Sequence, residues 1–172
     1  MKRVVDFWVK YRPQADPAAL EFLESDSIIV SYHKDEIIKL PDQHFPYFCV
    51  VLEGVVGGYS LNWQGQPLLR ELILPLDYFT GTIHLFSNRN LLTEYRALMP
   101  VQLLQIPIAR AVHGQQHYPD IAELFHVMKQ RKLNIQRYQV LIYQQTNAYN
   151  RYVLYRTYFP DWAHQLPHRI QY

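Results

Sequence analysis

The stretch YFCVVLEGVVGGYSL, residues 47–61, contains two apolar, β-rich runs that meet at Gly54. Glycine reaches backbone conformations that other residues avoid, so its position between the two runs indicates a turn between two strands. Similar runs and turn residues recur on both sides of this stretch. The predicted strands are 27–32, 36–40, 47–53, 55–61, 67–74, 91–97 and 101–106. Strands that recur about every 8–12 residues predict an antiparallel sandwich or barrel, and Gln64-Gly65 is a plausible hairpin tip within it.

Helical patterns flank the β-rich region. The first 25 residues have helical spacing, and Asp16 followed by Pro17 is typical of a helix N-cap and first turn. From Tyr118 onward the spacing is again helical and predicts one long helix over about residues 119–146. Its apolar stripe consists of Ile121, Phe125, Met128, Ile135 and Ile142. Such a stripe predicts a homodimer interface, and packing on the chain's own barrel is the alternative.

Composition and charge narrow the class of protein. The chain has 172 residues and one cysteine, so it has no internal disulfide. It has no run of 18 apolar residues and no secretory signal, so we expect an intracellular, cytoplasmic protein. Residues 1–109 carry 9 Lys/Arg against 12 Asp/Glu, whereas residues 110–172 carry 8 against 3. Only the second part is therefore expected to approach a polyanion, unless its charge is simply a solvated helix face.

Three segments carry a resemblance to a known family. They are KDEII (34–38), FCVVLEGVV (48–56) and LPLDYF (74–79). They resemble the "KGE-x-I", "F-V-L-x-G-x-V" and "PGD-F-F-G" signatures of the Crp/Fnr transcription regulators. The segment from Asn150-Arg151-Tyr152 to Leu166-Pro167 is similar to that family's lead-in to its helix-turn-helix. The resemblance covers about residues 20–172.

The resemblance implies an α+β fold and a regulatory function. It implies an antiparallel, jelly-roll-like β-roll (a double-stranded β-helix) with N-terminal helices, a long dimerisation helix and the start of a C-terminal helix-turn-helix domain. The corresponding divisions are a sensor at 1–117, a dimerisation helix at 118–146 and an incomplete DNA-binding part at 147–172. The implied protein is a homodimer that senses a small effector and binds DNA. The runner-up is a stand-alone ligand-binding or scaffold module without a DNA role.

In the family, a phosphate-binding cassette follows the third signature. The residues that fall on it here are Gly81, Thr82, Ile83, Leu91, Leu92 and Thr93. The family's ribose-binding glutamate falls on Thr82, and its phosphate-binding Arg-Ser pair falls on Leu91 and Leu92. A buried phosphate needs cationic donors, so we expect no tight binding of cyclic AMP or cyclic GMP. Arg89 and Arg96 are possible anion contacts. An apolar effector, a different anion, and a pocket filled by Leu91 and Leu92 all stay open.

Other chemistries find less support. A cupin-type metal enzyme needs clustered histidines. His113 and His117 are four residues apart, but a Gly/Gln-rich segment around them predicts a loop, so we expect no metal, no cofactor and no enzyme. Cys49 lies within a predicted strand, where a buried, inert thiol is expected. The tyrosines between 138 and 158 are expected to serve helix packing rather than base stacking.

DNA recognition is expected to be incomplete in these 172 residues. Residues 167–172 supply less than two turns of a first helix-turn-helix helix and nothing of the second. We therefore expect weak binding to duplex DNA without sequence preference, through the basic residues of the second part. Those residues are Lys129, Arg131, Lys132, Arg151, Arg156 and Arg169.

Overall fold

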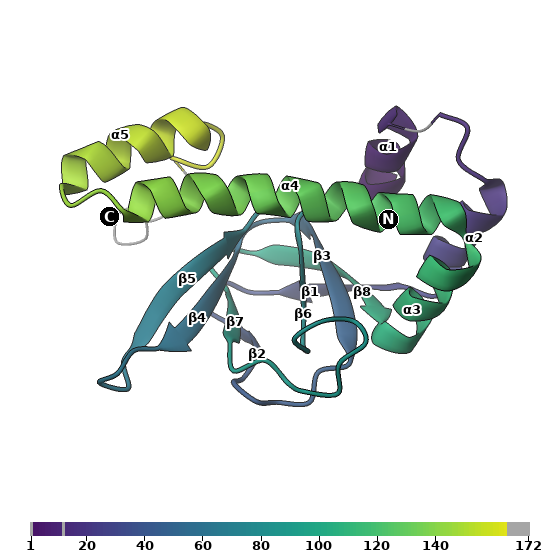
Figure 1. The fold of residues 1–172 in the computed structure, drawn as a ribbon, viewed down its shortest axis with the longest axis horizontal. Coiled ribbons are helices and arrows are strands. Elements are labelled where there is room, and N and C mark those ends of the chain that lie inside the picture. The colour runs from purple at the N-terminus through teal and green to yellow at the C-terminus, as the bar shows by residue number, and fades with distance from the viewer. Residues whose placement is uncertain (1, 12, 165–172) are drawn as a thin grey trace. The chain divides into compact units, whose positions relative to one another are not determined.

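The structure is a computed structural model, and it describes residues 2–11 and 13–164. The chain forms two compact units, Met1–Lys129 and Gln130–Tyr172. The first unit contains two four-stranded antiparallel sheets that form the β-roll (Figure 1). One sheet has the order β1 (Ile28–Tyr32), β8 (Val101–Pro107), β3 (Tyr47–Glu53), β6 (Tyr78–Thr80). The other has the order β2 (Ile37–Lys39), β7 (Glu94–Ala97), β4 (Val56–Leu61), β5 (Pro67–Ile73).

Strand β3 is buried on both of its faces. Phe48, Val50 and Leu52 belong to the core cluster that the helices of the first unit cover. Cys49 and Val51 alternate with them and belong to the second cluster, which lies between the sheets. Successive side chains of a strand point to opposite faces, so five consecutive apolar residues in β3 are needed to fill both cores. This double burial explains why the run at 48–52 is apolar throughout.

The turns that resemble family signatures have left-handed backbone conformations. Asp35 (φ 67°) and Leu76 (φ 64°) occupy the positions of the glycines in the "KGE" and "PGD" signatures. Gly54 has a φ of 79°, and a Cβ atom there would collide with the carbonyl oxygen of Pro100. Gly65 (φ 77°) confirms the predicted hairpin tip between β4 and β5. Asp35 and Leu76 thus adopt a left-handed conformation, which is more usual for glycine, at the positions where the resembled signatures carry glycine.

Helices pack on one face of the β-roll in the first unit. They are α1 (Lys2–Tyr11), α2 (Pro17–Ser25), α3 (Ile108–His117) and the first part of α4 (Pro119–Tyr143) (Figure 1). The side chain of Asp16 accepts a hydrogen bond of 2.9 Å from the backbone N–H of Ala18, which confirms the predicted N-cap of α2. Trp8 and Phe22 are buried with residues of β3 in the helix-covered core cluster.

Two short elements differ from the sequence prediction. The segment predicted as a loop around His113 and His117 is helix α3. A Cβ atom at Gly114 would collide with the ring of Phe22, so this glycine permits close packing of α2 and α3 rather than a loop. Strand β6, which is three residues long, was not predicted.

The predicted dimer stripe is used largely within the chain itself. Ile121 and Met128 are 1% and 3% exposed and belong to the helix-covered core, where Phe125 packs against them. Ile135 and Ile142, in the second unit, are also buried. A side chain that fills the chain's own core is not available to an interface, so this burial favours the alternative prediction for Ile121 and Met128. The alternative prediction, packing on the chain's own barrel, holds for the first part of α4.

The second unit contains the end of α4 and helix α5 (Ala148–Tyr158). Asn147 caps α5 by accepting a 2.7 Å hydrogen bond from the backbone N–H of Tyr149. The rings of Tyr138 and Tyr158 stack with centroids 4.4 Å apart, as expected of tyrosines that pack helices together. The helix predicted at 166–170 lies outside the described residues. No helix in the described part of the chain is both long and apolar enough to cross a membrane.

The two tryptophans at positions 8 and 63 give a matched test of the helix-covered core. Trp8 is 2% exposed, whereas Trp63, at the β4–β5 hairpin, is 91% exposed. Trp8→Ala should lower the free energy of unfolding by about 3–5 kcal/mol, because it removes a large buried side chain. Trp63→Ala should change it by no more than about 0.5 kcal/mol. Urea unfolding followed by circular dichroism measures both values, and equal effects would contradict the packing of α1.

Candidate functional site

The predicted cassette forms a closed loop after β6. A Cβ atom at Gly81 would collide with the carbonyl oxygen of Phe45, so only glycine fits at this position. The loop closes through an antiparallel bridge between Thr82 and Asn90. The backbone N–H of Leu91 also donates a 2.9 Å hydrogen bond to the carbonyl oxygen of Gly81. The residues predicted to form the cassette therefore lie in and beside one closed loop.

An open pocket of about 980 Å³ lies beside this loop, and we call it the cassette pocket. Its lining residues are Pro41, Asp42, Ser60, Leu61, Ile83, Asn88, Arg89, Asn90, Leu91, Leu92 and Thr93. The side chain of Leu91 packs partly against the core between the sheets, whereas Leu92 is 70% exposed. Of the three possibilities left open, a pocket filled by the side chains of Leu91 and Leu92 is the one that this geometry does not favour. Gly81 and Thr82 shape the loop and are not among the lining residues.

The polar groups of the cassette are directed to their own backbone. The hydroxyl of Thr82 donates to the carbonyl oxygen of His84 at 2.9 Å, and Thr82 is buried. Arg96 does not line the pocket, because its guanidinium donates two hydrogen bonds, of 2.9 and 2.6 Å, to Glu94. Of the two arginines expected as anion contacts, only Arg89 lines the pocket, and Asp42 lines it too. One exposed guanidinium facing a carboxylate is a poor counter-charge for a phosphate.

Lys39 is a feature of the cassette that the sequence reasoning missed. It is fully buried, and its ammonium donates to the carbonyl oxygens of Leu40, Leu91 and Thr93 at 2.9, 2.8 and 3.1 Å. Burial lowers the pKa of this ammonium, and nearby Asp42 opposes that shift. Three N–H groups meet three carbonyls, so none is left for a ligand. The only sequence signal was a lysine inside an apolar strand.

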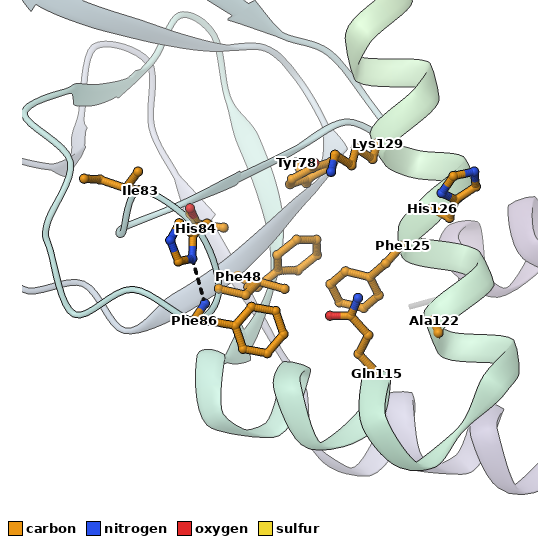
Figure 2. Close-up of a pocket in the computed structure, with 12 residues that line it drawn as sticks. Phe48, Tyr78, Ile83, His84, Phe86, Gln115, Ala122, Phe125, His126 and Lys129 are labelled. Atoms are coloured by element: carbon orange, nitrogen blue, oxygen red, sulfur yellow. Dashed lines mark hydrogen bonds between the residues drawn. The ribbon is translucent and has the colours of Figure 1, made fainter.

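A second pocket, which we call the aromatic pocket, encloses about 540 Å³ (Figure 2). Its lining residues are Phe48, Tyr78, Thr80, Ile83, His84, Leu85, Phe86, Gln115, Ala122, Phe125, His126 and Lys129. The ring of Phe48 lies between those of Phe125 and Tyr78, with centroid distances of 4.6 and 4.9 Å. All twelve residues belong to the first unit and come from β3, β6, the cassette loop, α3 and α4.

A few of the residues that line the aromatic pocket have polar side chains. Gln115 extends from α3 toward the rings of Phe48 and Phe125 (Figure 2). Its side-chain oxygen is shielded from solvent and has no hydrogen-bond partner among the described residues. His84 accepts a hydrogen bond of 3.2 Å at Nδ1 from the backbone N–H of Phe86, so its neutral ring carries its proton on Nε2. None of the lining residues is acidic.

The remaining candidate groups do not converge on a reactive centre. Cys49 is completely buried, and burial raises the pKa of its thiol, which confirms the expected inert thiol. The rings of His113 and His117 stack on α3 with centroids 4.0 Å apart. Among residues 2–11 and 13–164, no group of three or more His, Cys, Asp or Glu side chains is placed to hold a metal ion.

Comparison with known proteins identifies the fold. No protein-family model matches the chain, and no curated protein does. The sensor domain of the transcriptional regulator DNR from Pseudomonas aeruginosa is 18% identical, with a TM-score of 0.59 over 85% of this chain and 93% of that one. FixK2 from Bradyrhizobium japonicum is 20% identical, with a TM-score of 0.62 over 82% of this chain and 68% of that one.

The catabolite activator protein of Thermus thermophilus gives a similar result. It is 18% identical, with a TM-score of 0.58 over 80% of this chain and 64% of that one. The chain therefore has the β-roll fold of the sensor domains found in Crp/Fnr-type regulators, with flanking helices. Other structures with a similar fold are also described as transcriptional regulators, among them proteins from Streptomyces coelicolor and Thermotoga maritima.

The cassette pocket should not bind cyclic nucleotides. The side chains of Leu91 and Leu92 offer no hydrogen-bond donor to a phosphate. The hydroxyl of Thr82 already donates to the carbonyl oxygen of His84. The ammonium of Lys39 already donates three hydrogen bonds to backbone carbonyls. Isothermal titration calorimetry with cyclic AMP and cyclic GMP should give no heat of binding up to about 1 mM. A known cyclic-AMP-binding protein is the positive control. A micromolar dissociation constant would show that another cation reaches the phosphate.

Proposed function

We propose that the chain is the sensor and dimerisation part of a Crp/Fnr-like transcription regulator, and that its effector is not a cyclic nucleotide. The observation that carries this proposal is the course of α4. Ala122, Phe125 and Lys129 of α4 line the aromatic pocket, and the same helix continues into the second unit as far as Tyr143. A ligand that contacts the sensor end of such a helix can shift the preferred position of the helix. A unit or subunit that contacts the rest of the helix then responds to the ligand.

The proposed domain boundaries are those predicted from the sequence, with one adjustment. Residues 1–117 form the sensor, 118–146 the dimerisation helix and 147–172 the beginning of the DNA-binding part. The first part of α4 packs in the core of the sensor, so we assign residues 118–129 to both. The cassette pocket, with Ile83, Leu91, Leu92 and Thr93 in its wall, is the first proposed effector site. No residue of α4 lines it, so an effector there would act on α4 through the cassette loop, whose Ile83 also lines the aromatic pocket.

The homodimer is proposed to form through a different face of α4 from the one expected at first. Leu133, Val140 and Leu141 are 42%, 51% and 43% exposed on this helix. Leu133 and Val140 are seven residues apart, or two helical turns, which is the repeat that pairs helices. Large apolar side chains that are exposed on a monomer and lie along one helix are typical of an interface. We therefore propose that a second copy covers them.

Charge reversal on this face should separate the dimer. In Leu133→Asp/Val140→Asp, carboxylates on both subunits would lose water and repel each other, so light scattering should show a monomer with an unchanged circular dichroism spectrum. Leu61→Asp on β4 is the control, because Leu61 is 62% exposed and lies on the β-roll. A double variant that stays dimeric would place the interface elsewhere.

A role in DNA binding is proposed from the fold and the basic second part. A version of the protein with a complete helix-turn-helix, offered a pool of random duplexes, should enrich a two-fold-symmetric site with half-sites about one helical turn apart. Residues 1–172 should bind only weakly, with an affinity that falls steeply as salt rises. Enrichment of no sequence at all by the version with a complete helix-turn-helix would favour the alternative, a ligand-binding or scaffold module without a DNA role.

A further inference from the structure

We propose that the aromatic pocket is a second ligand site, separate from the cassette pocket, and that it binds a small aromatic carboxylate bearing a hydroxyl or N–H donor on its ring. The inference requires neither DNA binding nor a dimer. It rests on three properties of the pocket, namely its aromatic wall, its charge and one unpartnered oxygen. Each property selects a different part of the ligand.

The wall selects a flat apolar body. Phe125, Phe48 and Tyr78 form a continuous row of rings, with neighbouring centroids less than 5 Å apart. Phe86 extends from the cassette loop on the other side and is 64% exposed, which is unusual for a phenylalanine (Figure 2). An aromatic ring between Phe86 and this row would bury apolar surface on both of its faces and could stack on its neighbours. The volume is typical of sites for small ligands.

Lys129 and the donors near it select an anionic group at the edge. Lys129 and His126 come from α4, and His84 comes from the cassette loop. All three side chains are exposed at their residues, and no acidic residue lines the pocket to compete for them. A carboxylate at this edge stays partly hydrated and gains a cationic partner, which avoids the large free-energy cost of burying an unpaired charge.

The side-chain oxygen of Gln115 selects a donor at the inner end. It is buried and accepts no hydrogen bond from the described residues. Such an oxygen lowers stability until a donor reaches it, so a ligand that supplies an O–H or N–H gains a hydrogen bond that the empty protein lacks. Figure 2 shows Gln115 beside Phe125 and Lys129 beside Tyr78, which are the two ends of the row of rings, so the donor and the carboxylate of the ligand should stand at separate ends of its ring system.

Three fluorescent probes with one ring system separate these contributions. They are 6-hydroxy-2-naphthoate, 2-naphthoate, which lacks the hydroxyl, and 2-naphthol, which lacks the carboxylate. Fluorescence titration should show that 6-hydroxy-2-naphthoate binds best, with a loss of about three- to tenfold for either of the other two. Only the loss for 2-naphthol should shrink as salt is raised, because it alone reflects charge pairing.

Variants assign each contribution to a residue. Gln115→Met should remove the preference for 6-hydroxy-2-naphthoate over 2-naphthoate and, in the absence of ligand, raise the melting temperature by about 2–4 °C. Lys129→Gln should reduce the preference for 6-hydroxy-2-naphthoate over 2-naphthol. Phe86→Ala, at an exposed position that does not threaten folding, should weaken all three probes. Arg89→Gln, in the cassette pocket, is the matched control and should weaken none.

Other outcomes contradict the proposal. Failure of all three probes to bind below about 1 mM would overturn the ligand class. If Arg89→Gln weakens binding and Phe86→Ala does not, the ligand binds in the cassette pocket instead. A preference for the hydroxyl that survives Gln115→Met would remove the role of that oxygen. Binding of the probes by a protein that enriches no DNA sequence would support this site and count against the regulatory function.

Discussion

The double burial of strand β3 is the constraint on which the rest of the structure depends. Its side chains fill two cores at once, one between the sheets and one under the helices. Because the helices cover the β-roll on the face that Phe48 reaches, the aromatic pocket lies between that face, α3 and α4. The strand that holds the fold together therefore also forms part of the wall of the proposed ligand site. Substitutions in β3 should therefore usually affect both the stability of the fold and the proposed ligand site.

Two turns of the β-roll keep a left-handed backbone at residues other than glycine. Asp35 and Leu76 stand where glycine is usual, and both keep a positive φ. Leucine adopts this conformation only at a cost in free energy, which the surrounding contacts must offset. Leu76 packs partly against the helix-covered core, and this burial is one such contact. At Gly81, in contrast, the carbonyl of Phe45 leaves no room for any side chain, and glycine is present.

Much of the fold could be predicted from local patterns, and much of the site could not. All predicted strands exist, with ends within three residues, because alternation and turn residues are local signals. Helix α3 was missed because Gly114 serves a contact with Phe22, which sequence spacing does not reveal. The cassette loop was located by its signature, but the exposure of Leu92 depends on packing. The aromatic pocket joins segments far apart in the sequence, and a local pattern does not bring them together.

The three hydrogen bonds of the Lys39 ammonium affect how a ligand would bind in the cassette pocket. Its ammonium links the carbonyls of Leu40, Leu91 and Thr93 in the protein without any ligand. An internal cation thus holds the segment that a bound anion could otherwise hold through its own contacts. The cassette pocket is preorganised, so binding there need not be opposed by the entropy of ordering this segment. The selectivity of the cassette pocket then follows from its fixed shape rather than from a loop that adapts to each ligand.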